Sequence, residues 1–152
     1  MEIRIVELGG KVYEARLSER FEELPDAAEI RRSVFCEEQG FVNEFDDTDS
    51  RALHCVIYLD GAPAAVGRLF AGDNAGEAHV GRVAVSAEFR GRGVGSVVMS
   101  ALEQTARERG FSRVVLSAQC RAQGFYLANG YAPRGDVYPD EGCPHIEMTK
   151  EL

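Results

Sequence analysis

The chain has no surplus of basic residues, since 25 acidic and 17 basic side chains give its 152 residues a net charge of −8. This balance argues against nonspecific binding to nucleic acid. No stretch approaches the roughly 18 consecutive apolar residues of a membrane span, so we expect no membrane association. The first residues, MEIRIVELGG, lack the basic and then apolar segments of a secretory signal, and we expect a cytoplasmic protein.

Paired cysteine motifs are also missing. The four cysteines are scattered without a CxxC pair, and without an export signal we expect reduced thiols rather than disulfides. Cys143 and His145 offer two metal ligands, but no second pair stands at the spacing of a structural metal site. We therefore expect no metal.

The residues that are present are typical of one globular domain spanning residues 1–152, with 45% apolar and 28% charged residues. Apolar patterns and turn residues predict three helices, near residues 26–39, 94–109 and 121–128. They predict strands near residues 2–7, 11–17, 52–59, 62–71, 77–86, 113–118, 131–138 and 144–150. The order is mixed α/β, with antiparallel hairpins at both ends and a strand–helix–strand unit in the middle.

The first predicted helix opens at Pro25-Asp26 and ends at Gly40. Asp26 is expected to be its N-cap, and Glu29 would complete a capping box three residues later. The residues expected on its buried face are Ala27, Ile30 and Val34.

A glycine-rich segment, Arg90 to Gly95 (RGRGVG), lies between a predicted strand and a predicted helix. The start of a helix leaves unpaired backbone N–H groups with partial positive charge, and glycine lets such backbone approach a ligand closely. We expect a phosphate or pyrophosphate here, with Arg90 and Arg92 as charged donors at the rim. Residues 82–113 hold six arginines and three acids, which favours a small polyanion, although a solvated helix face would explain the same clustering.

The pattern Arg90-x-x-Gly93-x-Gly95, after the strand sequence GRVAV, resembles the acetyl-CoA loop of the GNAT acetyltransferase superfamily. The resemblance covers about residues 30–149. It implies an α/β (α+β) GNAT fold, with a mixed, mostly antiparallel sheet and helices on both faces. It also implies acetyl-CoA as the acetyl donor, bound by loop amides and by the preceding strand. The binding residues so implied are Val83, Ala84, Val85, Arg90, Gly91, Arg92, Gly93, Val94, Gly95 and Ser96.

A second segment, Phe125-Tyr126 followed by Gly130-Tyr131, resembles the GNAT pattern in which the tyrosine lies beside the CoA sulfur. A phenol at that place can stabilise or protonate the thiolate that leaves when an amine attacks a thioester. A core tyrosine packed on the sheet is the alternative. Gln119, at the end of a predicted strand, is expected either to line the thioester pocket or to cap the next helix.

Further matches resemble the ElaA-like branch of GNAT proteins, which implies an acetyltransferase whose amine acceptor, a small molecule or a peptide, is undefined. These matches are Arg32-x-Val34-Phe35-x-x-Glu38-Gln39-Gly40, Asp46, Asp49, His54, residues 81–85, Ala118-Gln119 and His145-x-x-Met148.

Some of the same residues also resemble acyl-homoserine-lactone synthases, which share the GNAT fold. They are Arg-x-x-Val-Phe from Arg31, two aspartates three residues apart, and Gly67-Arg68. The synthases lack a good Arg-x-x-Gly-x-Gly loop, so we keep such an acyltransferase as an alternative. A noncatalytic acyl-CoA-binding module is a second alternative.

An acceptor ammonium must lose its proton before it attacks, so a base is needed. The candidates are His145 on the last predicted strand and Glu38 near the end of the first predicted helix. His79 is a third, less favoured candidate. A structural histidine or a solvated carboxylate is the simpler explanation for each.

The acidic loop at residues 41–50 carries Asp46, Asp47 and Asp49. These carboxylates either recognise a cationic acceptor or form a solvated turn. We expect donor and acceptor to bind together and to react by direct attack, with a backbone N–H of the central strand polarising the carbonyl. The sequence leaves a monomer and a homodimer open.

Overall fold

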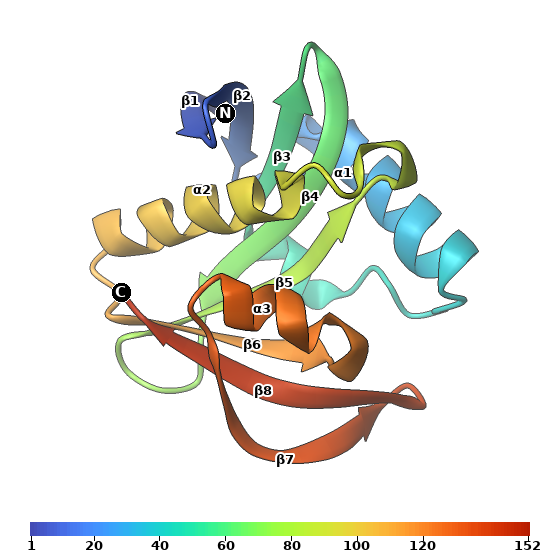
Figure 1. The fold of residues 1–152 in the computed structure, drawn as a ribbon, viewed down its shortest axis with the longest axis vertical. Helices are drawn as coiled ribbons and strands as arrows, with labels where there is room; N and C mark the ends of the chain where they lie inside the picture. The colour runs from blue at the N-terminus through green and yellow to red at the C-terminus, as the bar shows by residue number, and fades with distance from the viewer.

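All eight strands join one mixed sheet in a computed structural model that describes residues 1–152 (Figure 1). The strand order is β1-β2-β3-β4-β5-β6-β8-β7. The strands are β1 (Glu2–Leu8), β2 (Lys11–Ser18), β3 (Leu53–Leu59), β4 (Ala62–Ala71), β5 (Glu77–Val85), β6 (Arg113–Gln119), β7 (Ala132–Asp140) and β8 (Cys143–Glu151). The α-helices are α1 (Pro25–Arg31), α2 (Val94–Glu108) and α3 (Gln123–Ala128).

Neighbouring strands are antiparallel throughout, apart from the parallel pair β5 and β6. Helix α2 makes the crossover between these two strands, as a parallel connection requires. Hairpin turns at Gly9-Gly10 and Asp60-Gly61 join β1 to β2 and β3 to β4, and all four residues have positive φ angles. The predicted mixed, mostly antiparallel sheet is therefore correct.

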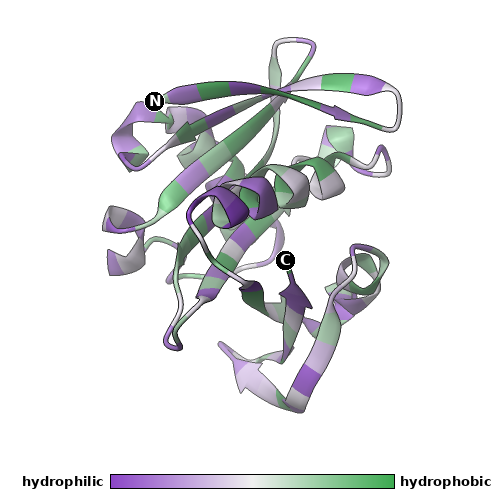
Figure 2. Ribbon diagram, turned by 90° about the vertical axis from the view of Figure 1, so that its left-hand side faces the viewer, coloured by the Kyte–Doolittle hydropathy of each residue, from purple (hydrophilic) through white to green (hydrophobic).

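The core is divided by the sheet, because α2 covers one face and α1 the other (Figure 1). The face of α2 that packs on the sheet includes the buried residues Val94, Val97, Val98, Ala101, Leu102 and Thr105. The smaller cluster under α1 contains the predicted residues Ala27, Ile30 and Val34. Hydrophobic colouring is concentrated on the central strands, whereas every residue of the outer strand β7 is exposed (Figure 2). None of the helices combines the length and apolar character that a membrane crossing requires.

The first helix differs from its prediction at its start. Pro25 occupies the first turn, where its missing N–H costs nothing, and Leu24 is the N-cap. Asp26 therefore lies inside the helix, and its carboxylate accepts a hydrogen bond from the Tyr58 hydroxyl. The expected Asp26 cap is wrong. Beyond α1 the chain continues as a π-helical segment, η2 (Arg32–Glu38), before it turns at Gly40.

The parallel pair separates part of the way along its length. Strand β5 pairs with β6 only from Glu77 to Val80. In the next segment β5 contains one residue more than β4, and Arg82 in this bulge has a φ of 52°. A bulge bends its strand and increases its twist. Main-chain groups of residues 81–85 that face away from β4 therefore have no partner strand, and a cleft opens between β5 and β6.

A buried ion network fixes the loop beside this cleft. Arg31 at the end of α1 is 0% exposed, and its Nε donates to the Glu44 carboxylate at 2.9 Å while its Nη1 donates to Asp49 at 2.8 Å. Arg68 on β4 contacts Asp49 and Asp46, each at 2.8 Å. Arg82 contacts Glu44 at 3.0 Å and Asp46 at 3.2 Å. Three arginines and three carboxylates thus join α1, the acidic loop and the bulge of β5.

Substitution of Arg31 by methionine is expected to lower the free energy of unfolding by about 3–5 kcal/mol, because it removes one of the two arginine partners of each of the buried carboxylates Glu44 and Asp49. Urea denaturation measures the change. Arg20→Met is the control, since Arg20 and Glu22 form a solvent-exposed pair and its loss is expected to cost less than about 1 kcal/mol. Equal effects of the two substitutions would contradict a structural role for the network.

Candidate active site

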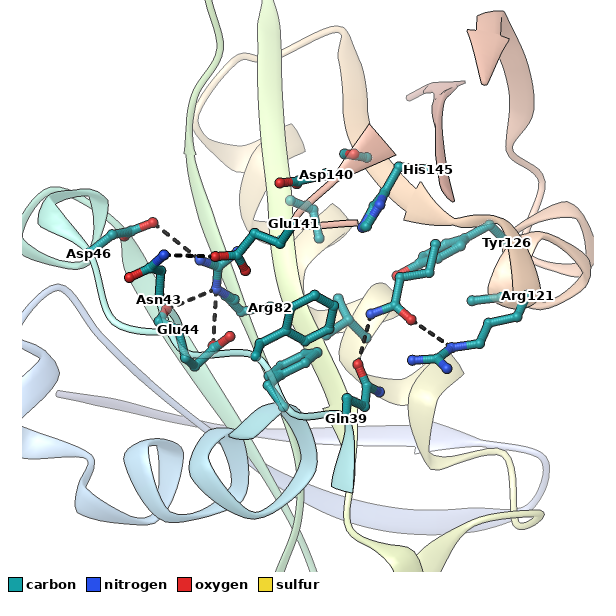
Figure 3. Close-up of a pocket in the computed structure, with 18 residues that line it drawn as sticks. Gln39, Asn43, Glu44, Asp46, Arg82, Arg121, Tyr126, Asp140, Glu141 and His145 are labelled. Carbon is teal, nitrogen blue, oxygen red and sulfur yellow. Dashed lines mark hydrogen bonds and ion pairs between the residues drawn. The ribbon is translucent and has the colours of Figure 1, made fainter. Parts of the chain in front are cut away.

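A cavity of about 570 Å³ lies where β5 and β6 separate (Figure 3). It is closed by the loop after η2, by the segment leading into α3 and by the β7–β8 turn. The lining residues with polar side chains are Gln39, Asn43, Glu44, Asp46, Arg82, Ser117, Gln119, Arg121, Tyr126, Asp140, Glu141 and His145. The separation of the two strands therefore produces an enclosed site with many potential hydrogen-bonding groups.

A second cavity of about 560 Å³ continues from the first toward the start of α2. The two share Gln39, Val83, Arg121 and Ala122, so they form one groove. Val83, Ala84 and Val85, which the family resemblance implies as donor-binding residues, line this second part. The groove thus runs along the free edge of β5 from the glycine loop to the larger cavity.

The start of α2 presents backbone N–H groups without a side-chain cap. Gly93 is the N-cap residue, with a φ of 78° that strongly favours glycine. Gly95 is buried, and a Cβ atom added there would lie 2.9 Å from Phe125 Cε1, so a side chain would push α3 away. Both glycines keep the first turn of α2 open and close to α3. A phosphate fits the uncompensated amides of such a helix start.

Arg90 and Glu38 form a two-pronged ion pair across the groove, with N–O distances of 2.8 and 2.9 Å. Arg90 Nε also donates to the Val85 carbonyl at 3.0 Å. The Arg90 guanidinium lowers the pKa of the Glu38 carboxyl. Because Glu38 is ion-paired and its pKa is lowered, it is a weaker candidate for the base than its position in the sequence suggests. Arg92 lies over the Phe89 ring and does not line the groove.

Tyr126 on α3 lines the larger cavity beside Gln119. Its ring packs edge-on against Phe125 and Tyr131, and its hydroxyl has no hydrogen-bond partner within the chain. Burial raises the pKa of Tyr126 to about 12, so the hydroxyl keeps its proton at neutral pH. The sequence left open a core tyrosine or one beside the donor. In the structure the ring packs on the core while the hydroxyl belongs to the cavity.

His145 lines the same cavity from β8 and is only 7% exposed. Its Nδ1 lies 2.8 Å from the Cys143 carbonyl, which can only accept, so Nδ1 carries a proton. In the neutral imidazole Nε2 is then the unprotonated nitrogen, and it has no partner within the chain. His145 is thus the histidine that can accept a proton from a molecule in the cavity.

The other two histidines are placed away from the cavity. His79 stacks on Phe70 with ring centroids 4.8 Å apart, and burial lowers its pKa. His54 is fully buried beside Phe21 and contacts the Asp49 carbonyl at 2.9 Å. Burial also lowers the pKa of His54. His79, the third candidate base, therefore does not line the cavity.

Gln119 lines the cavity and does not cap the following helical turn with its side chain. Its amide donates to Gln39 Oε1 at 2.9 Å and accepts from Arg121 Nε at 2.7 Å. This connects the end of β6 to the loop after η2. Of the two roles open in the sequence, the structure has the pocket-lining one.

The acidic loop takes neither of its two expected roles in full. Asp46 and Asp49 are ion-paired with arginines, and only Asp47 remains a solvated carboxylate of the turn. The cavity also includes four charged residues that the sequence analysis did not single out: Glu44, Arg121, Asp140 and Glu141. No local motif surrounds them, and only the fold places them together. No group of three or more His, Cys, Asp or Glu side chains has the arrangement of a metal site.

Comparisons with known proteins agree with this geometry. The family model of the acetyltransferase (GNAT) family matches residues 11–131. The uncharacterized N-acetyltransferase YjcF of Bacillus subtilis is 34% identical over 140 residues, which cover 90% of this chain and 99% of YjcF. Protein ElaA of Escherichia coli is 33% identical over 129 residues, covering 82% of this chain and 84% of ElaA.

Solved structures give the same result. The crystal structure of Escherichia coli ElaA aligns with a TM-score of 0.80 and 29% identity, covering 91% of this chain and 99% of ElaA. An acyl-CoA N-acyltransferase from Pseudomonas aeruginosa aligns with a TM-score of 0.79 and 28% identity over 91% and 99% of the two chains. The chain therefore belongs to the GNAT acetyltransferase family and is an acyltransferase that uses acetyl-CoA as its donor.

Proposed function

We propose that the protein transfers the acetyl group of acetyl-CoA directly to an amine, with both substrates bound in the groove between β5 and β6. The observation that carries this proposal is the pairing of two proton-transfer groups in one cavity. His145 presents an unpartnered nitrogen, and Tyr126 presents a protonated hydroxyl. The cavity continues along β5 as far as Arg90, the first residue of the glycine-rich segment before α2. An amine nucleophile and a thiolate leaving group require a base and an acid in this arrangement.

The donor is assigned to the part of the groove beside α2. The backbone amides of residues 91–96 would provide the phosphate site, with the Arg92 side chain turned toward Phe89, and Arg90 adds charge once it leaves Glu38. The free edge of β5 at Val83 to Val85 offers backbone partners to an extended amide-containing chain. In this proposal the donor carbonyl lies in the larger cavity beside Gln119, where the end of that strand separates from β6.

Two proton movements accompany the transfer. His145 Nε2 takes the proton that the acceptor ammonium loses, and the amine nitrogen then bonds to the acetyl carbon. The carbon–sulfur bond breaks, and the Tyr126 hydroxyl donates its proton to the leaving sulfur. A backbone N–H on the free edge of β5 polarises the carbonyl. Holding the reacting groups together in this geometry supplies a large part of the acceleration.

Tyr126→Phe is expected to lower kcat about 100-fold, because the leaving thiolate loses its proton donor. The affinity for acetyl-CoA, measured by calorimetry, should stay nearly unchanged because the phenyl ring retains its packing against Phe125. Release of CoA in the presence of an amine measures turnover. An unchanged kcat would remove Tyr126 from the chemistry.

His145→Gln is expected to lower kcat by about 100-fold or more, because no base then accepts the ammonium proton. Glu38→Gln is the comparison that separates the two candidate bases. Since Arg90 already neutralises Glu38 at an exposed position, its loss should change kcat less than about threefold. The reverse order of effects would assign the base to Glu38.

Gly93→Val is expected to weaken acetyl-CoA binding about tenfold, because a β-branched residue does not tolerate the φ of 78° that opens the start of α2. Gly110→Val is the matched control: Gly110 follows α2, has a φ of 86°, and has open space around its Cα. Both variants carry similar backbone strain, but only Gly93 adjoins the donor. Equal donor affinities in the two variants would refute the phosphate site.

Binding and chemistry are separated by two measurements on the unmodified protein. A rise in melting temperature with acetyl-CoA reports donor binding. Release of CoA across a broad panel of amines reports transfer. Binding without release would identify a noncatalytic acyl-CoA-binding module instead of the proposed enzyme.

A further inference from the structure

Some of the charged side chains around the larger cavity have ion-pair partners, whereas others have none. Glu44 and Asp46 line it, but both belong to the buried network with Arg31, Arg68 and Arg82. The two carboxylates of the β7–β8 turn, Asp140 and Glu141, also line the cavity and have no ion-pair partner in the chain. The uncompensated negative charge of the cavity therefore lies at this turn.

The turn is held in place over the cavity. Glu141 and Gly142, the two residues between β7 and β8, have φ angles of 50° and 75°, as a tight hairpin turn requires. Asn43 Nδ2 donates to Glu141 Oε1 at 2.9 Å and so connects the turn to the loop beside the ion network. The hairpin turn and the Asn43 contact therefore hold the Glu141 carboxylate in place, with Asp140 next to it in the chain.

A separate observation indicates a ligand at this place. The His145 side chain is more than nine-tenths buried, and its Nε2 has no partner within the chain. In Figure 3 His145 lies between the carboxylates of the turn on one side and Tyr126 with Arg121 on the other. Arg121 has no ion-pair partner either, so the cavity is positive at its donor end and negative at its far end.

We propose that the acceptor is a primary amine that carries a second cationic group, such as a linear diamine. This inference rests on the proposed function of the cavity. One amino group lies at His145 and is acetylated, while the distal ammonium binds Asp140 and Glu141. Arg121 disfavours the reverse orientation, and an acceptor with a distal carboxylate is repelled by the turn.

Calorimetric titration tests the inference without requiring turnover. With CoA present, 1,4-diaminobutane is expected to bind more tightly than 1-aminobutane, which has the same chain and one charge. Substituting both Asp140→Asn and Glu141→Gln should weaken diamine binding about tenfold and leave the monoamine unaffected. Glutamine at position 141 can still accept the Asn43 hydrogen bond, so the turn is retained.

Asp136→Asn is the matched control, because Asp136 is an exposed carboxylate of the same strand outside the cavity. It should leave diamine affinity unchanged. Equal affinities for the diamine and the monoamine, or an unaltered diamine affinity in the double variant, would overturn the inference. Diamine binding that depends on the turn without any release of CoA from acetyl-CoA would overturn the proposed function and leave the acceptor site in place.

Discussion

The incomplete pairing of β5 with β6 is the constraint on which the site depends. A parallel pair that continued to the ends of both strands would fill the cleft with hydrogen bonds and leave no edge for a ligand. Here the pairing stops at Val80, and the bulge at Arg82 turns the rest of β5 away. The cost is a set of strand groups without partners in the chain. A substrate with amide groups can satisfy them, so the same defect in the sheet provides the binding surface.

The buried ion network explains how this open edge is kept in one shape. Four of its six charged groups are buried, which is expensive, and a buried salt bridge is by itself weak evidence for stability. The network instead connects three segments that are distant in sequence, and it places Arg82 of the bulge and Glu44 of the loop at fixed positions. The residues that resemble acyl-homoserine-lactone synthases, such as Arg31 and Asp49, belong to this network. That similarity is therefore explained by the construction of the cleft wall and does not depend on the length of the acyl chain.

Local patterns predicted most of the fold, because hairpin turns, helix faces and the glycine loop are each encoded within a few neighbouring residues. Predictions from local sequence failed where a contact with a residue distant in sequence determines the role of a side chain. Asp26 has the sequence signature of a cap, but Pro25 occupies the first turn of the helix, and the Tyr58 hydroxyl donates a hydrogen bond to the Asp26 carboxylate. Glu38 looks like a free acid until Arg90, far along the chain, pairs with it. Asp140 is an ordinary turn residue until the fold places it over the cavity.

The placement of Tyr126 and His145 on different elements has a chemical consequence. Transfer to an amine needs a protonated acid and an unprotonated base at the same time. If the two side chains were hydrogen-bonded to each other, each would occupy the site that the substrate must use. Burial against aromatic rings keeps the Tyr126 hydroxyl protonated, and the Cys143 carbonyl directs the His145 proton away from the cavity. In the proposed mechanism, separate environments thus orient the donor hydroxyl of Tyr126 and the acceptor Nε2 of His145, which reduces the reorganisation needed during the reaction.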